Sequence, residues 1–155
     1  MDKNFEIDNV DLDILNILSA DAKKPYTEVA KKVFVSSGTV HVRMNKMEEA
    51  GIVLGSTLNL DYTKLGYGLT AFLGIYLSKS SLYDEVLEQL SQIKEVVSIH
   101  YTTGNYSMFL KLQCRDTGKL KDILHDNIQK VDGIERTETI ISLEESVSRN
   151  IALSK

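Results

Sequence analysis

The sequence predicts an α+β protein in which a three-helix helix-turn-helix unit precedes a βαββαβ domain. Up to Gly51, apolar side chains recur every three or four positions, which is the spacing of helices. From Leu69 onward, strand-like runs, the first apolar and the others alternating, are separated by two helical stretches. We therefore expect a helix-turn-helix domain over residues 1–55, a linker over 56–68 and a second domain over 69–155.

The first two predicted helices begin at residues suited to helix starts. Asp8 or Asn9 can cap a helix that ends near Ala20. Pro25, the only proline, fixes the entry to a second helix over about residues 27–33. The expected apolar face of the first helix consists of Val10, Ile14, Leu15 and Leu18.

A third helix is predicted within residues 35–51, VSSGTVHVRMNKMEEAG. Two serines can accept hydrogen bonds from the amides of its first turn, and Gly51 suits the left-handed position after its last turn. In the turn before it, Phe34 occupies a position where a positive φ often requires glycine. We expect either a different turn there or strain at Phe34. Ala30 suits the close helix crossing, and the buried stripe of the third helix is Val40, Met44 and Met47.

The remaining elements follow from alternation and turn signals. Residues 52–60 alternate and predict a strand, and residues 61–68 predict a connection that bends at Gly66 and Gly68. Ser81 and Asp84 resemble a capping box that starts a helix ending near Ile93. A second helix is expected from Asp116 or Thr117 to near Val131. Strands of the domain are expected at 69–77, 96–103, 106–114 and 134–143, with a hairpin at Gly104 and Asn105.

This element order suits a four-stranded antiparallel sheet with both helices on one face. The other face must then be covered, and a second copy of the chain is the economical cover.

Composition narrows the function classes. The 155 residues contain no long apolar run and no signal-peptide pattern, so we expect a cytoplasmic protein without a membrane span. Cys114, the only cysteine, is expected to be a buried thiol.

The net charge of −4 argues against non-specific polyanion binding by the whole molecule. Between residues 22 and 47, however, Glu28 is the only acid among six bases: Lys23, Lys24, Lys31, Lys32, Arg43 and Lys46.

The sequence contains no recognisable set of catalytic residues. His41, His100 and His125 lie in different predicted elements without metal-ligand spacing. Cys114 has no evident base beside it, and no phosphate-cradling glycine motif occurs. We therefore predict that the protein is not an enzyme and has no metal or cofactor.

Four segments together resemble the Lrp/AsnC (feast/famine) family of bacterial and archaeal transcription regulators. They are IDNVDLDIL, YTEVAKKVFVSSGTVHVRMNKMEEAGI, HYTTGNYSMFLKLQCRD and IQKVDGIERTETIISLEE. The resemblance covers nearly the whole chain. It implies a winged-type helix-turn-helix and a ferredoxin-like, RAM/ACT-like domain. It also implies a nucleoid-associated homodimer that assembles into an octamer, reads a pseudo-palindromic operator in double-stranded DNA and binds an amino-acid effector.

Details of the resemblance bear on the effector. GTVHVRMNKME, YTTGNYSMF and ERTETIISL are most similar to the asparagine-responsive branch of the family. Many relatives carry an aspartate where this chain has Ser107. An uncharged Ser107 removes a carboxylate that could hold a cationic ligand, which favours a neutral amide such as asparagine. Phe34 and Ser37 depart from the family pattern of glycine and proline in the turn before the third helix.

The DNA-binding residues are expected on the third helix. Its first half can reach base edges or phosphates, and a guanidinium or ammonium can anchor a phosphate or a guanine edge. Arg43 could instead be held by an internal acidic partner, and the whole face could be merely solvated. The expected DNA contacts are Ser36, Ser37, Thr39, His41, Arg43 and Lys46.

The resemblance places the effector at the hairpin, between dimers. Gly104 allows close approach to its backbone, where amides can take a carboxylate. Hydroxyls come from Tyr101, Tyr106 and Ser107, Gln129 could pair with a side-chain amide, and Glu138 with Thr139 could receive the ammonium group. Two alternatives stay open: an architectural DNA-binding protein without an effector, and a ligand-sensing module whose helix-turn-helix contacts proteins.

Overall fold

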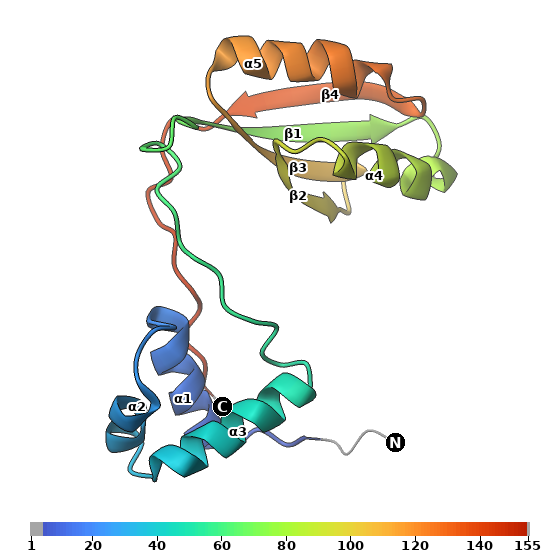
Figure 1. Cartoon of the computed structure of the whole chain (residues 1–155). Helices are drawn as coiled ribbons and strands as arrows, with labels where there is room; N and C mark the ends of the chain where they lie inside the picture. The colour runs from blue at the N-terminus through green and yellow to red at the C-terminus, as the bar shows by residue number, and fades with distance from the viewer. Residues whose placement is uncertain (1–4, 155) are drawn as a thin grey trace. The chain divides into compact units, whose positions relative to one another are not determined.

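The structure is a computed structural model that describes residues 5–154. The described chain forms two compact units (Figure 1). One contains the residues up to 59 together with the C-terminal segment from 147, and the other spans Leu60–Ser146. No helix in the described part of the chain is long and apolar enough to cross a membrane.

Three helices form the first unit: α1 (Asn9–Ala20), α2 (Tyr26–Lys32) and α3 (Ser37–Glu49). Asp8, one of the two caps predicted from the sequence, caps α1 and forms a reciprocal capping box with Asp11. The three helices share one apolar core, in which the small Ala30 is buried as expected. The buried core residues are Ile14, Leu18, Val29, Ala30, Val40, Met44 and Met47.

The turn between α2 and α3 is strained at Phe34. This residue adopts φ = 57°, and it is the one non-glycine residue with positive φ in the described chain. Its side chain is 93% exposed, so no burial compensates the unfavourable backbone. The prediction of strain at Phe34 is confirmed. Gly51 likewise has the positive φ, 70°, expected after the end of α3.

Two expectations about the chain around the first unit are corrected. Residues 52–60 do not form the predicted strand, because no strand of the described chain lies beside them to complete a ladder. Residues 147–154, expected in the second domain, return to α1. The backbone N–H of Leu153 donates to Asn16 Oδ1 at 2.8 Å, and Asn16 Nδ2 donates to the Leu153 carbonyl at 2.9 Å.

The second unit is built on the predicted four-stranded antiparallel sheet, with strand order β2-β3-β1-β4 (Figure 1). β1 matches its expected bounds. β2 and β4 end two residues earlier than expected, and β3 begins two residues later than expected. The hairpin between β2 and β3 is therefore a six-residue loop over 102–107, longer than a two-residue turn. The strands are β1 (Leu69–Leu77), β2 (Val96–Tyr101), β3 (Met108–Cys114) and β4 (Ile134–Ile141).

Both connecting helices form, with irregular ends. A 3₁₀ turn (Ser80–Leu82) precedes α4 (Tyr83–Ser91), and the predicted capping box of Ser81 with Asp84 is absent because α4 begins after Leu82. Asp116 caps α5 (Thr117–Asp122), accepting from the Lys119 backbone N–H at 2.8 Å. α5 continues through a π-helical turn (Ile123–Asn127) and a 3₁₀ turn (Ile128–Lys130).

The two helices cover the same face of the sheet, as predicted. Leu73 of β1 and Leu110 of β3 are buried there with Val86 of α4 and Leu120 of α5. Cys114 lies in this core as predicted, and burial raises the pKa of its thiol. The neighbouring positions along each strand, such as Phe72, point to the face that no helix of the unit covers.

Candidate functional site

The start of α3 is fixed by hydroxyl groups. Ser36 Oγ accepts from the Thr39 backbone N–H at 3.0 Å and lies 2.8 Å from Thr39 Oγ1. Ser36 and Ser37 are exposed, whereas Thr39 is half-buried. The first turn of α3 therefore presents small hydroxyl side chains to solvent.

Farther along α3, His41 and Lys46 are exposed. The His41 ring packs edge-on against Tyr26 of α2, with centroids 5.7 Å apart. This contact holds the imidazole at the junction of the two helices. Of the nearby lysines, Lys24 pairs with Asp21 at 3.5 Å, while Lys23, Lys31 and Lys32 are exposed.

Arg43 faces inward to two acids, as in the alternative that the sequence left open. Its Nη1 lies 2.8 Å from Asp8 Oδ2 and 2.7 Å from Asp11 Oδ1. The Asp11 side chain is only 2% exposed. The bonds to Asp11 and then Asp8 raise the pKa of Arg43, while the Asp11 backbone amide and then Arg43 lower the pKa of Asp8. The guanidinium thus links α3 to the start of α1.

In the second unit, the 102–107 loop is held at both ends. Thr102 Oγ1 donates to the Tyr106 carbonyl at 2.8 Å. The Ser107 backbone N–H donates to the Ile75 carbonyl at 2.8 Å, and Ser107 Oγ accepts from the Leu77 N–H at 3.3 Å. Gly104, at the exposed tip, has φ = 102°, which an L side chain rarely adopts.

Glu138 is already engaged by neighbouring side chains. It accepts from Tyr106 Oη at 2.8 Å and from Tyr76 Oη at 3.1 Å. Arg136 Nη2 lies 3.2 Å from it, and the Arg136 guanidinium stacks 4.0 Å from the Tyr76 ring centroid. The tyrosine hydrogen bonds lower the pKa of Glu138, and the carboxylate raises the pKa of Tyr106. Tyr76 and Arg136 were missed from the sequence, although both share the alternation that places Glu138 on the uncovered face.

The other expected effector residues are not brought together within one chain. Tyr101 packs against Tyr83 of α4, with ring centroids 4.4 Å apart, on the helix-covered face. Thr139 pairs with Leu73 and so points to that same face, opposite to its neighbour Glu138. Gln129 is exposed in the 3₁₀ turn after α5.

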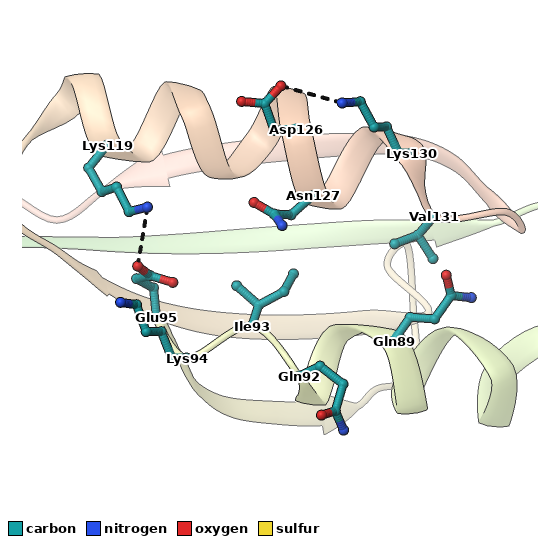
Figure 2. Close-up of a pocket in the computed structure, with 10 residues that line it drawn as sticks. All are labelled: Gln89, Gln92, Ile93, Lys94, Glu95, Lys119, Asp126, Asn127, Lys130 and Val131. Carbon is teal, nitrogen blue, oxygen red and sulfur yellow. Dashed lines mark hydrogen bonds and ion pairs between the residues drawn. The ribbon is translucent and has the colours of Figure 1, made fainter.

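A separate groove of about 640 Å³ lies between the end of α4 and the helix that begins with α5 (Figure 2). An ion pair between Lys119 and Glu95 joins its two sides at 3.5 Å, and a pair between Lys130 and Asp126 at 3.4 Å lies along one wall. None of the seven expected effector residues lines it. Within residues 5–154, no group of three or more histidine, cysteine or acidic side chains is placed to hold a metal.

Comparison with known proteins agrees with both units. Residues 7–53 match the family model described as "Winged helix-turn-helix DNA-binding", and residues 70–151 match "Lrp/AsnC ligand binding domain". The chain is 43% identical to "Regulatory protein AsnC" of Haemophilus influenzae over 145 residues, covering 94% of this chain and 97% of that protein. The chain belongs to the Lrp/AsnC family. The regulatory protein AsnC of Escherichia coli is 41% identical, covering 96% and 98% of the two chains.

Solved structures of other proteins share the fold. The structure of E. coli AsnC matches with a TM-score of 0.91 and 40% identity, covering 96% of this chain and 100% of that one. A transcriptional regulator of Neisseria meningitidis, solved in complex with L-methionine, matches with a TM-score of 0.90 at 21% identity, covering 96% and 97%. The second match supports the fold alone.

The protein is thus an AsnC-type transcriptional regulator with a DNA-binding helix-turn-helix and an amino-acid-binding domain. This confirms the family and the α+β fold class predicted from the sequence. The relatives are named as regulatory proteins, which agrees with the expected absence of an enzymatic role.

Proposed function

We propose that this regulator responds to asparagine, which binds at the 102–107 loop and changes how the helix-turn-helix units engage a pseudo-palindromic operator. The observation that carries the proposal is the loop itself. Its tip at Gly104 is open, since a Cβ there would have no atom within 4 Å. Exposed backbone amides around such a residue suit a carboxylate. The uncharged Ser107 nearby favours a neutral ligand over a cationic one.

Tyr106 and Ser107 are the parts of the proposed site that the loop supplies directly. Glu138 positions Tyr106 through a 2.8 Å hydrogen bond. The Glu138 carboxylate therefore already accepts a hydrogen bond from the protein before an ammonium group binds. We propose that Gln129 and Thr139 of a neighbouring copy complete the site, with Tyr101 at the start of the loop. The effector would then lie between dimers.

A homodimer that assembles into an octamer is the proposed active form. The uncovered sheet face carries Phe72 stacked on Phe109, with ring centroids 5.8 Å apart, and the half-exposed Ile140. In the segment that follows α3, Leu54 and Leu58 are 94% and 71% exposed. Apolar groups left in water at these places favour burial against a second copy.

Each dimer would present two α3 helices to successive major grooves of nucleoid DNA in the cytoplasm. The proposed reading face is Ser36, Ser37, Thr39 and His41, with Lys46 on a phosphate. A two-fold arrangement of these faces matches a pseudo-palindromic operator.

A mobility-shift titration on the chain's own promoter region, with and without asparagine, tests the proposal. We expect a specific shift at physiological salt whose midpoint moves when asparagine is added. Calorimetry against the twenty amino acids checks which one binds. If none of the twenty amino acids binds, the protein is better described as an architectural DNA-binding protein. If no specific mobility shift is seen, the proposal that it binds an operator fails.

A further inference from the structure

We infer that Arg43 is a positioning residue that orients the recognition helix α3 and does not itself contact DNA. Arg43, Asp8 and Asp11 form what we call the acidic clasp. Arg43 comes from α3, whereas Asp8 and Asp11 come from the cap and first turn of α1. The clasp therefore ties the recognition helix to the start of the chain's first helix.

Every oxygen of the acidic clasp has an assigned partner. Asp8 Oδ1 accepts from the Asp11 backbone N–H at 2.9 Å, and Asp11 Oδ2 accepts from the Asp8 N–H at 3.0 Å. The remaining oxygens, Asp8 Oδ2 and Asp11 Oδ1, both bind Arg43 Nη1, at 2.8 and 2.7 Å. The capping box and the ion pair thus orient the two carboxylates toward one guanidinium.

Because Asp11 is buried, it would be costly for Arg43 to leave the acidic clasp and bind a DNA phosphate instead. The Asp11 side chain is 2% exposed and the Arg43 side chain 28% exposed. Turning the guanidinium toward DNA would leave the Asp11 carboxylate in the protein interior without its cation. Lys46, one turn farther along α3, is exposed and can reach a phosphate without that loss.

The two roles differ in the salt dependence of operator binding. A residue on a phosphate contributes about one to the slope of log affinity against log salt, because its contact releases counterions. A positioning residue changes affinity without changing that slope. We therefore compare Arg43→Ala with Lys46→Ala on one operator fragment over a range of salt concentrations, and confirm by thermal melting that both variants are folded.

We expect Arg43→Ala to weaken operator binding about tenfold or more with the wild-type slope, and Lys46→Ala to lower the slope by about one. Asp11→Asn, which removes the charge and keeps the shape, should weaken binding in the same way as Arg43→Ala. A slope that falls by about one in Arg43→Ala, or an Asp11→Asn variant with wild-type affinity, would overturn the inference.

If Arg43→Ala does not fold, a variant in which Asp11 and Arg43 are both replaced by neutral residues provides the test. The Asp11→Asn/Arg43→Gln double variant restores a hydrogen-bonding pair without charge. If Arg43 acts by positioning, this double variant binds the operator more tightly than Arg43→Gln alone. If the double variant binds no better than Arg43→Gln, Arg43 acts on DNA directly and the inference fails.

Discussion

The phenol ring of Tyr106 lies directly over the backbone of Gly74, in the space that a β-carbon at position 74 would occupy. Gly74 is in the central strand β1, on the face that carries Glu138. The missing side chain leaves room for the ring, whose hydroxyl donates to Glu138 at 2.8 Å. A glycine in one strand thus determines where the 102–107 loop rests.

We predict that Gly74→Ala displaces Tyr106 and destabilises the second unit. Overpacking of this kind costs about 1–3 kcal/mol, measurable as a lower midpoint of urea unfolding. Gly68→Ala is the matched control, because its β-carbon would meet Thr63 at an ordinary contact distance of 3.8 Å. Equal stability of the Gly74→Ala variant and this control would contradict the packing role of Gly74.

The hydrogen bond between Tyr106 and Glu138 predicts a loss of stability at both ends of the pH range. The pKa of Glu138 is below its ordinary 4.5 in the folded protein. Its contribution is present above that ordinary value and is lost as pH falls through the folded pKa. The pKa of Tyr106 is above its ordinary 10.0, so its contribution is present below 10.0 and is lost as pH rises through the folded pKa.

Ultraviolet titration of the tyrosines checks the alkaline limb of this prediction. Tyr106→Phe should remove a phenol whose pKa is above 10.0, and Glu138→Gln should lower the pKa of Tyr106. Tyr62→Phe, at an exposed tyrosine of the linker, serves as the control. A late-titrating phenol that persists in Tyr106→Phe would show that another tyrosine is responsible.

Breaking the acidic clasp should destabilise the helical unit. Arg43→Ala leaves the buried Asp11 carboxylate without its cation, a loss of about 3 kcal/mol. Lys46→Ala, on the same helix but exposed, should change stability by no more than about 0.5 kcal/mol. Chemical denaturation of the two variants gives the comparison, and similar values for both would mean that the clasp contributes little to folding.

Phe34→Gly should stabilise the protein. At φ = 57° glycine avoids a backbone penalty of about 1 kcal/mol, and the 93% exposed ring contributes little burial. Lys32→Gly, at the last residue of α2, should instead lower stability by up to about 1 kcal/mol, because glycine is a poor helix former. Thermal melting distinguishes the two effects, and a lower melting temperature for Phe34→Gly would show that its ring makes a contact in the assembled protein.

Local patterns in the sequence determined the helices, the strands and the two layers of the second unit. Helix spacing and capping residues are local properties, so α1 and the start of α3 could be predicted from neighbours in the chain. A continuous apolar run predicted β1 at its observed bounds. Alternation failed at residues 52–60, because it shows that a strand is suitable and cannot supply a partner strand.

The tertiary structure alone decided which charged groups meet. Arg43 has its ion-pair partners 32 and 35 positions away in the chain, and Glu138 receives hydroxyls from two different parts of the second unit. Such contacts depend on how elements pack, which local periodicity does not encode. The same reason explains why Glu138 and Thr139 point to opposite faces and why residues 147–154 return to α1. The sequence determined which family of regulators this is, and packing decided which of its polar side chains are already engaged within the fold.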